Sequence, residues 1–183
     1  NKMISSFSNY DDYLKSLKMH AKIEHFIPLY MARIAQLTNK SNQFNLTTKR
    51  YTQSEIEETE NDESYITLYG KLEDIFGDNG VISVVIGHIK ENVLEIDLWI
   101  MSCRVLKRDM EFAMMDELVK KSKEKGIEKI KGFYYPTVKN NMVRNFYEIQ
   151  GFEKINEDEN GNTIWELDLT REYKNKNKFI EVE

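Results

Sequence analysis

The feature that most constrains the fold is a run of three strand-length apolar segments followed directly by the longest helical segment of the chain. The strand-like segments cover residues 64–74, 80–90 and 93–103. Turn-forming Gly, Asp and Asn residues at 77–80 separate the first two, and a second short turn precedes the third, so an antiparallel meander is predicted. Residues 109–125 then repeat apolar side chains at helical spacing. This order predicts a mixed α/β fold.

The remaining segments complete one domain. Helices are predicted at residues 7–20, 27–37, 52–62 and 140–150, and strands at 21–26, 127–135, 152–158 and 163–169. A chain of 183 residues suits one hydrophobic core. We divide it into a helix or linker from an upstream domain at residues 1–18, a domain at residues 19–170, and a charged, loose tail at residues 171–183.

Charge and cysteine content argue against several classes of function. With a net charge of −5, the chain is not expected to present the dense basic face that binding of nucleic acid requires. Cys103 is the only cysteine, so no internal disulfide can form and a reducing, cytoplasmic compartment is expected. No apolar run approaches the ~20 residues of a membrane span. His20, His25 and His88 have no carboxylate or thiol at metal-ligand spacing, so no metal site is predicted.

Two patches of the sequence resemble the GNAT (GCN5-related N-acetyltransferase) fold. Residues 96–119, IDLWIMSCRVLKRDMEFAMMDELV, look like the strand, loop and helix that hold acyl-CoA in that family, and residues 140–154, NNMVRNFYEIQGFEK, look like its FY…GF segment. The resemblance implies a mostly antiparallel sheet that is splayed between its fourth and fifth strands, 93–101 and 127–135. Strand backbone groups would then pair with pantetheine amides, and N–H groups at the helix start would hold the pyrophosphate.

The resemblance also implies roles for individual residues. The cofactor-binding residues, for CoA or the phosphopantetheine of a carrier protein, would be Trp99, Ile100, Met101, Ser102, Cys103, Arg104, Val105, Lys107, Arg108, Asp109, Met110, Asn140 and Asn141. Tyr147 would protonate the leaving thiolate, and the alternative is a tyrosine that only packs against the core.

The fourth predicted strand offers two further candidates. Asp97 alternates with the apolar residues of this strand and could act as a base for an attacking amine or hydroxyl. The alternative is an ordinary solvated strand face, although Trp99 on the same face argues that it is partly covered. Cys103 lies where an acyl group would pass and could take it up. The alternative is a small buried hydrophobic residue.

The loop before the long helix departs from the family pattern Q/R-x-x-G-x-G/A. Arg104 fits the first position, but Lys107 and Asp109 replace the glycines. Side chains there are expected to crowd a phosphate, and the Asp109 carboxylate is expected to compete for the N–H groups of the helix start. Lys107 and Arg108 could compensate by binding phosphate through their side chains. These changes weigh more against CoA than against a carrier-protein arm, which lacks the CoA pyrophosphate.

A narrower resemblance covers nearly the whole chain. RIAQLTNKSNQFNLTTKRYT, FGDNGVISVVIG and MSCRVL together look like the C-terminal part of FkbH-like proteins. Those proteins join a HAD-type phosphatase domain to a GNAT-like domain and load a glyceryl unit, derived from a phosphorylated three-carbon acid, onto an acyl carrier protein for methoxymalonyl-type polyketide extender units. No DxDxT-type phosphatase motif is present in this chain, which begins at Asn1, so a piece of a longer protein is expected.

A polar run between residues 38 and 52 is poorly explained by folding alone. Its members are Asn39, Asn42, Gln43, Asn45, Thr47, Thr48, Arg50 and Tyr51. Amides and hydroxyls suit a hydroxylated substrate such as a glyceryl group, and Arg50 suits a carboxylate or phosphate. The alternative is a loop whose side chains bond to its own backbone.

The sequence therefore predicts an acyltransferase-like domain that handles an acyl or glyceryl thioester of CoA or of an acyl carrier protein. A second interpretation stays open, in which a GNAT-fold module without chemistry of its own docks a carrier protein or the HAD domain.

Overall fold

The fold is a sheet of eight strands in the order β6-β7-β5-β4-β3-β2-β1-β8, with helices on both faces. The computed structural model describes residues 9–183. The strands are β1 (Met19–Glu24), β2 (Tyr65–Asp74), β3 (Gly77–Lys90), β4 (Val93–Met101), β5 (Lys129–Tyr134), β6 (Glu153–Glu157), β7 (Thr163–Asp168) and β8 (Ile180–Val182). Within the described residues only β4–β5 and β1–β8 pair in parallel. The predicted mixed α/β class with a mostly antiparallel sheet is confirmed.

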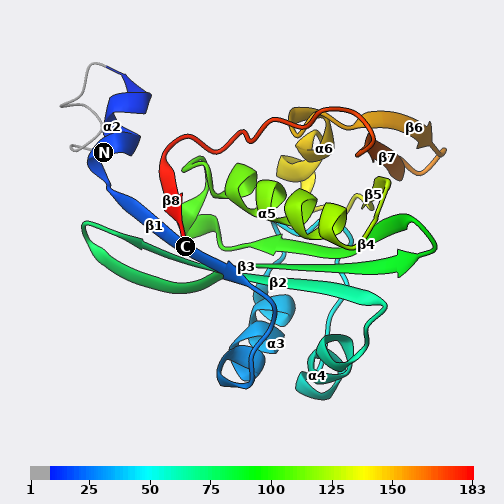
Figure 1. Cartoon of the computed structure of the whole chain (residues 1–183), viewed down its shortest axis with the longest axis horizontal. Coiled ribbons are helices and arrows are strands. Elements are labelled where there is room, and N and C mark those ends of the chain that lie inside the picture. The colour runs from blue at the N-terminus through cyan, green and yellow to red at the C-terminus, as the bar shows by residue number, and fades with distance from the viewer. Residues whose placement is uncertain (1–8) are drawn as a thin grey trace.

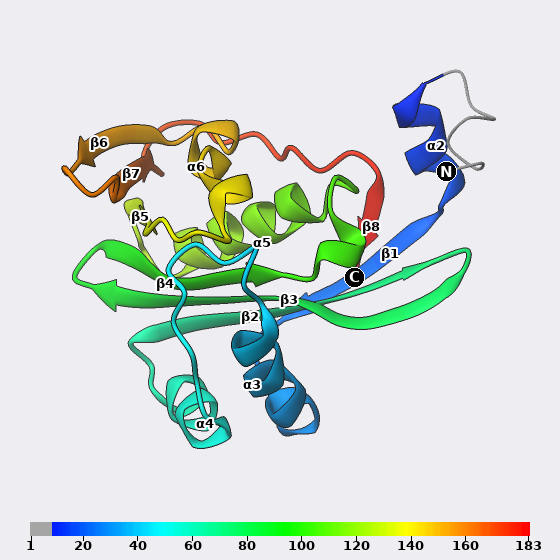
Figure 2. The ribbon, with the colours of Figure 1, turned by 180° about the vertical axis from the view of Figure 1, so that it is seen from behind.

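The helices form two layers. Figures 1 and 2 show α5 (Met110–Glu124) and α6 (Phe146–Ile149) on one face of the sheet, and α3 (Met31–Lys40) and α4 (Gln53–Asn61) on the other. The other helical elements are α2 (Tyr10–Ser16) and the short 3-10 helices η1 (Pro28–Tyr30), η2 (Cys103–Val105) and η3 (Asn141–Val143). None of the helices in the described part combines the length and apolar character that a bilayer crossing requires.

Local sequence signals locate most elements well. Strands β2, β3 and β4 form the predicted meander. Thr52 and Glu55 form the predicted capping box at the start of α4. The first turn of the meander lies at residues 75–76 rather than at 77–80, because Gly77 already pairs with Asp74 in the hairpin.

Two predicted helices come out shorter. The helix expected at 140–150 is the 3-10 helix η3 followed by the single turn of α6. The helix expected at 7–20 is α2, which ends before β1 begins at Met19. Residues 1–8 lie outside the described part of the chain. They include the first two residues of this predicted helix and the beginning of the N-terminal segment predicted at residues 1–18.

Strand β4 contains a β-bulge. Its pairing with β3 shifts by one residue between Ile96 and Leu98, which leaves Asp97 as the extra residue. Ile96 and Trp99 therefore both lie in the core beneath α5, whereas Leu98 lies in the core beside α3. The uninterrupted alternation expected from the sequence is wrong here, because one inserted residue moves the later side chains to opposite faces.

The C-terminal residues 171–183 pack against the domain. The buried Asp116 carboxylate of α5 accepts hydrogen bonds from the Tyr173 hydroxyl (2.6 Å) and from the N–H groups of Lys176 and Asn177 (both 3.0 Å). Strand β8 then pairs with β1, and Figure 1 shows the tail passing α6 and α5 on the way. The expectation of a loose tail is wrong, because a buried carboxylate on α5 supplies partners that composition does not reveal.

Candidate functional site

Strands β4 and β5 part shortly after they begin. Their parallel pairing covers Val93 to Glu95 on β4 and Lys129 to Lys131 on β5, and it stops just before the Asp97 bulge. A bulge bends its strand and interrupts the ladder, which explains why the two strands diverge at this point. The splayed sheet predicted from the sequence is present.

The gap between the two strands is filled by the chain itself. Residues 43–47, called the gap segment below, come from the connection between α3 and α4. The N–H of Leu46 donates to the carbonyl of Trp99, and the N–H of Met101 donates to the carbonyl of Phe44 (both 3.2 Å). The carbonyl of Leu46 also accepts from the N–H of Tyr135, just beyond β5 (2.9 Å). Figure 2 shows this connection rising from α3 across β4 before it returns to α4.

This arrangement corrects one expectation. The sequence predicted that the open edge of β4 would carry unpaired peptide groups, yet the Trp99 carbonyl and the Met101 N–H are both bonded to the gap segment. Asn45 also forms an isolated antiparallel bridge with Ile100. The partner lies about fifty residues away along the sequence, so local patterning could not reveal it.

Most side chains of the polar run bond to nearby backbone. Asn39 donates to the carbonyls of Ala35 and Tyr51 at 2.9 and 3.0 Å, and Thr47 donates to the carbonyl of Asp97 at 2.6 Å. Asn45 donates to the Ser41 carbonyl and accepts from the Thr48 N–H, while Arg50 donates to the carbonyls of Thr38 and Ser41 and to Asn42. These contacts match the alternative interpretation, in which the loop satisfies its own polar groups.

Asn140 holds the gap segment in place. Its buried carboxamide donates to the carbonyls of Asn45 (2.9 Å) and Tyr135 (3.0 Å) and accepts from the N–H of Thr137 (2.7 Å). Its neighbour Asn141 is exposed and begins η3. Asn140 was predicted to contact a cofactor, but its polar atoms are already taken by the chain.

A cavity of about 760 Å³ opens at the end of β4. Its lining residues are Arg33, Leu37, Lys40, Ser41, Asn42, Gln43, Phe44, Met101, Ser102, Cys103, Arg104 and Lys139. Four of these are basic and none is acidic, and we call it the cation-lined cavity. Within the described residues no carboxylate pairs with any of the four cations. Unpaired cations in a protein of net charge −5 favour an anionic ligand here.

Cys103 is exposed in this cavity. Its Sγ donates a hydrogen bond to Oε1 of Gln43 at 3.2 Å. The alternative interpretation of Cys103 as a small buried hydrophobic residue is therefore wrong. The residue begins η2, just beyond the end of β4, and its side chain is exposed there.

The loop before α5 keeps a backbone shape that glycine usually adopts. Lys107 and Asp109 have φ angles of 60° and 78°, both in the left-handed region. Holding a non-glycine residue there costs about 1–2 kcal/mol. Arg108 is not free for a phosphate, because its Nη1 pairs with Asp74 at 2.8 Å. Lys107 stays exposed.

The expected competition by Asp109 for the helix start does not occur. The Asp109 carboxylate makes no capping hydrogen bond to α5. Its Oδ2 instead accepts from the N–H groups of Lys178 and Phe179 in the tail, at 2.5 and 3.2 Å. The C-terminal tail therefore takes up this carboxylate.

Glu111, in the first turn of α5, was missed by the sequence reasoning. Burial, with a smaller contribution from the charge of Asp109, raises the pKa of its carboxyl group to about 7, although the backbone amides of Glu111 and Lys107 partly oppose this rise. An acidic residue in a first helical turn is an ordinary favourable placement, so nothing in the sequence marks it.

The two predicted catalytic residues lie outside the lining of the cation-lined cavity. Tyr147 is buried, and its hydroxyl makes no hydrogen bond of ordinary geometry within the described residues. Its ring lies so close to Gly132 of β5 that an added Cβ would approach it to 2.5 Å. Burial raises the pKa of the Tyr147 phenol. Asp97, half-buried on the bulge, has its carboxylate 3.5 Å from Nζ of Lys49.

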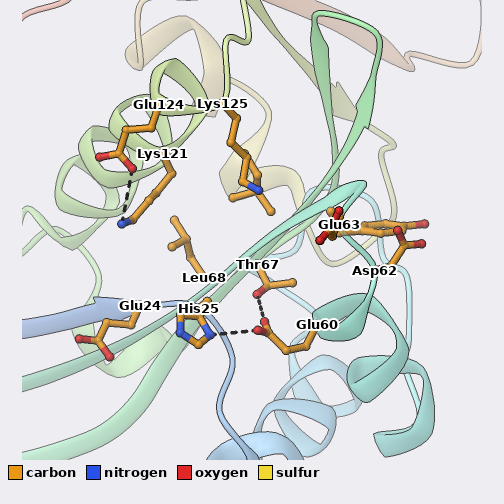
Figure 3. A pocket seen from close by; sticks show the side chains of 12 residues that line it. Glu24, His25, Glu60, Asp62, Glu63, Thr67, Leu68, Lys121, Glu124 and Lys125 are labelled. Carbon is orange, nitrogen blue, oxygen red and sulfur yellow. Dashed lines mark hydrogen bonds and ion pairs between the residues drawn. The ribbon is translucent and has the colours of Figure 1, made fainter.

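A second cavity, of about 620 Å³, lies at the other end of the sheet. Figure 3 shows His25 turned toward Glu60, with Lys121 on α5 and Lys125 directly after that helix across from them. Nδ1 of His25 lies 2.9 Å from Oε2 of Glu60, and the Thr67 hydroxyl donates to Oε1 of Glu60 at 2.6 Å. We call it the acid-rich cavity, since its lining includes Glu24, Glu60, Asp62, Glu63 and Glu124. No group of three potential metal ligands occurs among the described residues.

Comparison with known proteins places the fold. No family model and no curated protein matches the chain. Among solved structures it resembles a GNAT-family acetyltransferase from Streptococcus pneumoniae, with a TM-score of 0.64, 14% identity and coverage of 81% of this chain and 98% of that one.

Two further structures agree. The ribosomal-protein-S18-alanine N-acetyltransferase of Escherichia coli gives a TM-score of 0.60 at 11% identity, covering 85% of this chain and 98% of that one. The PaiA N-acetyltransferase of Thermoplasma acidophilum, solved in complex with coenzyme A, gives 0.58 at 16% identity, covering 81% and 98%. The chain has the GNAT fold.

Proposed function

We propose that this chain is an acyltransferase-like domain that receives an acyl thioester with its carbonyl carbon beside Cys103. The observation that carries the proposal is an exposed thiol at the end of β4, inside a cavity lined by four cations and no acid. The GNAT fold supports it, since a GNAT-fold neighbour was solved with coenzyme A. A reducing, cytoplasmic setting would keep the thiol available.

The chemistry is a transfer between two sulfur atoms. The Cys103 thiolate attacks the thioester carbonyl, a new carbon–sulfur bond forms at Sγ, and the bond to the donor sulfur breaks. The proton lost by Cys103 ends on the departing thiolate, so a donor thiol is released. Arg104 and Lys139, which line the same cavity, would attract any negative charge on the acyl group.

The resemblance to FkbH-like proteins supplies the finer part of the proposal. A glyceryl unit derived from a phosphorylated three-carbon acid would suit the cations, and an acyl carrier protein and an upstream HAD-type domain would be partners. The biosynthesis of methoxymalonyl-type polyketide extender units would be the setting. The domain predicted at residues 19–170 would extend through the tail, because β8 belongs to its sheet, and residues 1–18 would lead from the upstream part.

Intact-protein mass spectrometry tests the proposal. The protein is incubated with acetyl-CoA, with a glyceryl-loaded carrier protein, and with a short glyceryl thioester of N-acetylcysteamine. A mass increase equal to one acyl group, mapped to Cys103 and absent in Cys103→Ser, is expected. An acyl group found on no residue, or found equally on the Cys103→Ser variant, contradicts the proposal.

One observation favours the second candidate, a module without chemistry of its own. The gap between β4 and β5 holds residues 43–47 rather than open backbone. If this filling is permanent, the domain keeps the GNAT shape only to dock a carrier protein or a HAD domain. Calorimetric titration with glyceryl-loaded carrier protein, followed by mass spectrometry of the product, distinguishes the two, because the docking module binds the carrier protein without any acylation of Cys103.

A further inference from the structure

The gap segment occupies the part of β4 along which the fold family lays a thioester arm. We propose that residues 43–47 are a displaceable occupant of this track, so that a pantetheine arm binds only when the segment leaves, and that its departure also releases the Cys103 thiol. This inference rests on the proposed function.

The first support is the hydrogen-bonding pattern. The Leu46 N–H and the Phe44 carbonyl bond to the Trp99 carbonyl and the Met101 N–H of β4. A pantetheine arm also presents amide N–H and carbonyl groups along an extended chain. The same donor and acceptor on β4 cannot serve both chains at once, so the two are mutually exclusive there.

The second support is the way the segment is held. Side-chain hydrogen bonds from Thr47 to the Asp97 carbonyl (2.6 Å) and from Asn140 to the Asn45 carbonyl (2.9 Å) hold it at the bulge and beyond β5. Thr48, directly after it, has a φ angle of 61°, a left-handed conformation that a β-branched residue adopts at a cost. Release of the segment relieves that conformation.

The third support is the link to the thiol. Gln43 begins the gap segment, and its Oε1 accepts the hydrogen bond from Cys103 Sγ at 3.2 Å. Phe44, the next residue, lines the same cavity and packs edge-on against Phe146 with ring centroids 5.5 Å apart. Moving the segment out of the gap therefore also breaks the Gln43–Cys103 contact. Arm binding and thiol release are coupled through one stretch of chain.

Amide hydrogen exchange gives the direct test. With acetyl-CoA or phosphopantetheine at saturating concentration, the amides of Leu46 and Tyr135 are expected to exchange faster, while the Met101 amide stays protected because the arm replaces its partner. Ligand binding with unchanged protection at Leu46 overturns the inference and leaves the proposed function standing.

Variants give the second test. Thr47→Val removes the hydroxyl that bonds to Asp97 with little change of shape, and its matched control is Thr163→Val, another buried threonine with a side-chain hydrogen bond, to Trp165 on β7. Loss of the Thr47 hydrogen bond should increase the population of the state in which the gap segment is released, and should therefore tighten binding of the arm about five-fold. Asn140→Ala should act in the same direction. The Thr163→Val control should leave affinity unchanged.

The outcomes separate this inference from the proposed function. If acetyl-CoA and phosphopantetheine bind neither the unaltered protein nor the Thr47→Val and Asn140→Ala variants, the segment is a permanent part of the fold and the inference is overturned. The short N-acetylcysteamine thioester lacks most of the arm, so acylation of Cys103 by it reports on the proposed function alone. Equal or weaker arm binding by folded Thr47→Val likewise contradicts the inference.

Discussion

The two ends of the sheet carry cavities of similar size, about 760 and 620 Å³, but opposite electrostatics. At the end of β4 four cations surround an exposed thiol without a single carboxylate in the lining. At the other end five acidic residues line the cavity, and two of them have charged partners within the chain: His25 pairs with Glu60, and Lys121 lies 3.8 Å from Glu124.

The difference teaches where function should be sought. Charges that pair within the chain are accounted for by folding, as Glu60 and Glu124 are in the acid-rich cavity. Like charges gathered around a cavity without partners repel one another and add nothing to stability, so a ligand is the better explanation for them. The cation-lined cavity is therefore the candidate site, and the acid-rich cavity serves as its internal control.

The largest expected effect comes from Cys103→Ser. Acyl uptake should fall at least about a hundred-fold, because a serine hydroxyl without a base is a far weaker nucleophile than a thiolate. Mass spectrometry of the acylated protein measures it. His25→Ala in the acid-rich cavity is the matched control and should leave uptake unchanged. Loss of acyl uptake in His25→Ala would place the chemistry at the acid-rich cavity and would contradict the assignment to Cys103.

Glu111 lies in the first turn of α5, at the same end of the sheet as Cys103. Its ionisation should make the free energy of unfolding depend on pH. Because its folded pKa is raised to about 7, the folded protein binds more protons than the unfolded chain between the ordinary glutamate pKa and about 7. Its contribution to stability is present at low pH and is lost as the pH rises through 7. Glu111→Gln should raise the free energy of unfolding at pH 8 by about 2 kcal/mol.

Denaturant unfolding at pH 5 and pH 8 measures this slope. Glu117→Gln, about two turns along the same helix, is the matched control and should leave the slope unchanged. A stability difference between Glu111→Gln and the unaltered protein that does not vary with pH would contradict the assignment.

Neutralising one cation of the cavity should have a smaller effect. Lys139→Gln should weaken binding of an anionic thioester about five-fold, and the loss should shrink as salt is added, because exposed charges are screened. Lys125→Gln in the acid-rich cavity is the matched control. Titration at two salt concentrations makes the comparison, and an equal effect of both variants would remove the contrast between the ends.

Tyr147→Phe should have the smallest effect. The buried phenol lies outside the cavity and packs beneath Gly132, so acyl uptake should change less than about two-fold. Single-turnover acylation followed by mass spectrometry checks this. A larger loss, with the thermal stability unchanged, would restore Tyr147 as the proton donor that the family resemblance implies.

The candidate site was only partly visible in the sequence. Cys103 and Arg104 were singled out and do line the cavity, because they directly follow a strand whose end is easy to locate. Asn45, Thr47 and Asn140 were expected to meet a ligand and instead bond to the chain. An amide that reads a substrate and one that completes a loop look alike in sequence, since both need only a hydrogen-bonding partner.

The sequence by itself determined the meander of β2 to β4, the capping box of α4 and the long helix α5. Each depends on contacts between residues that are neighbours along the chain or across a tight turn. Only the tertiary structure decided that residues 43–47 lie between β4 and β5 and that the tail bonds to Asp116 and Asp109. Those partners lie about fifty to ninety residues apart, and such contacts follow from how the layers pack, which no local pattern encodes.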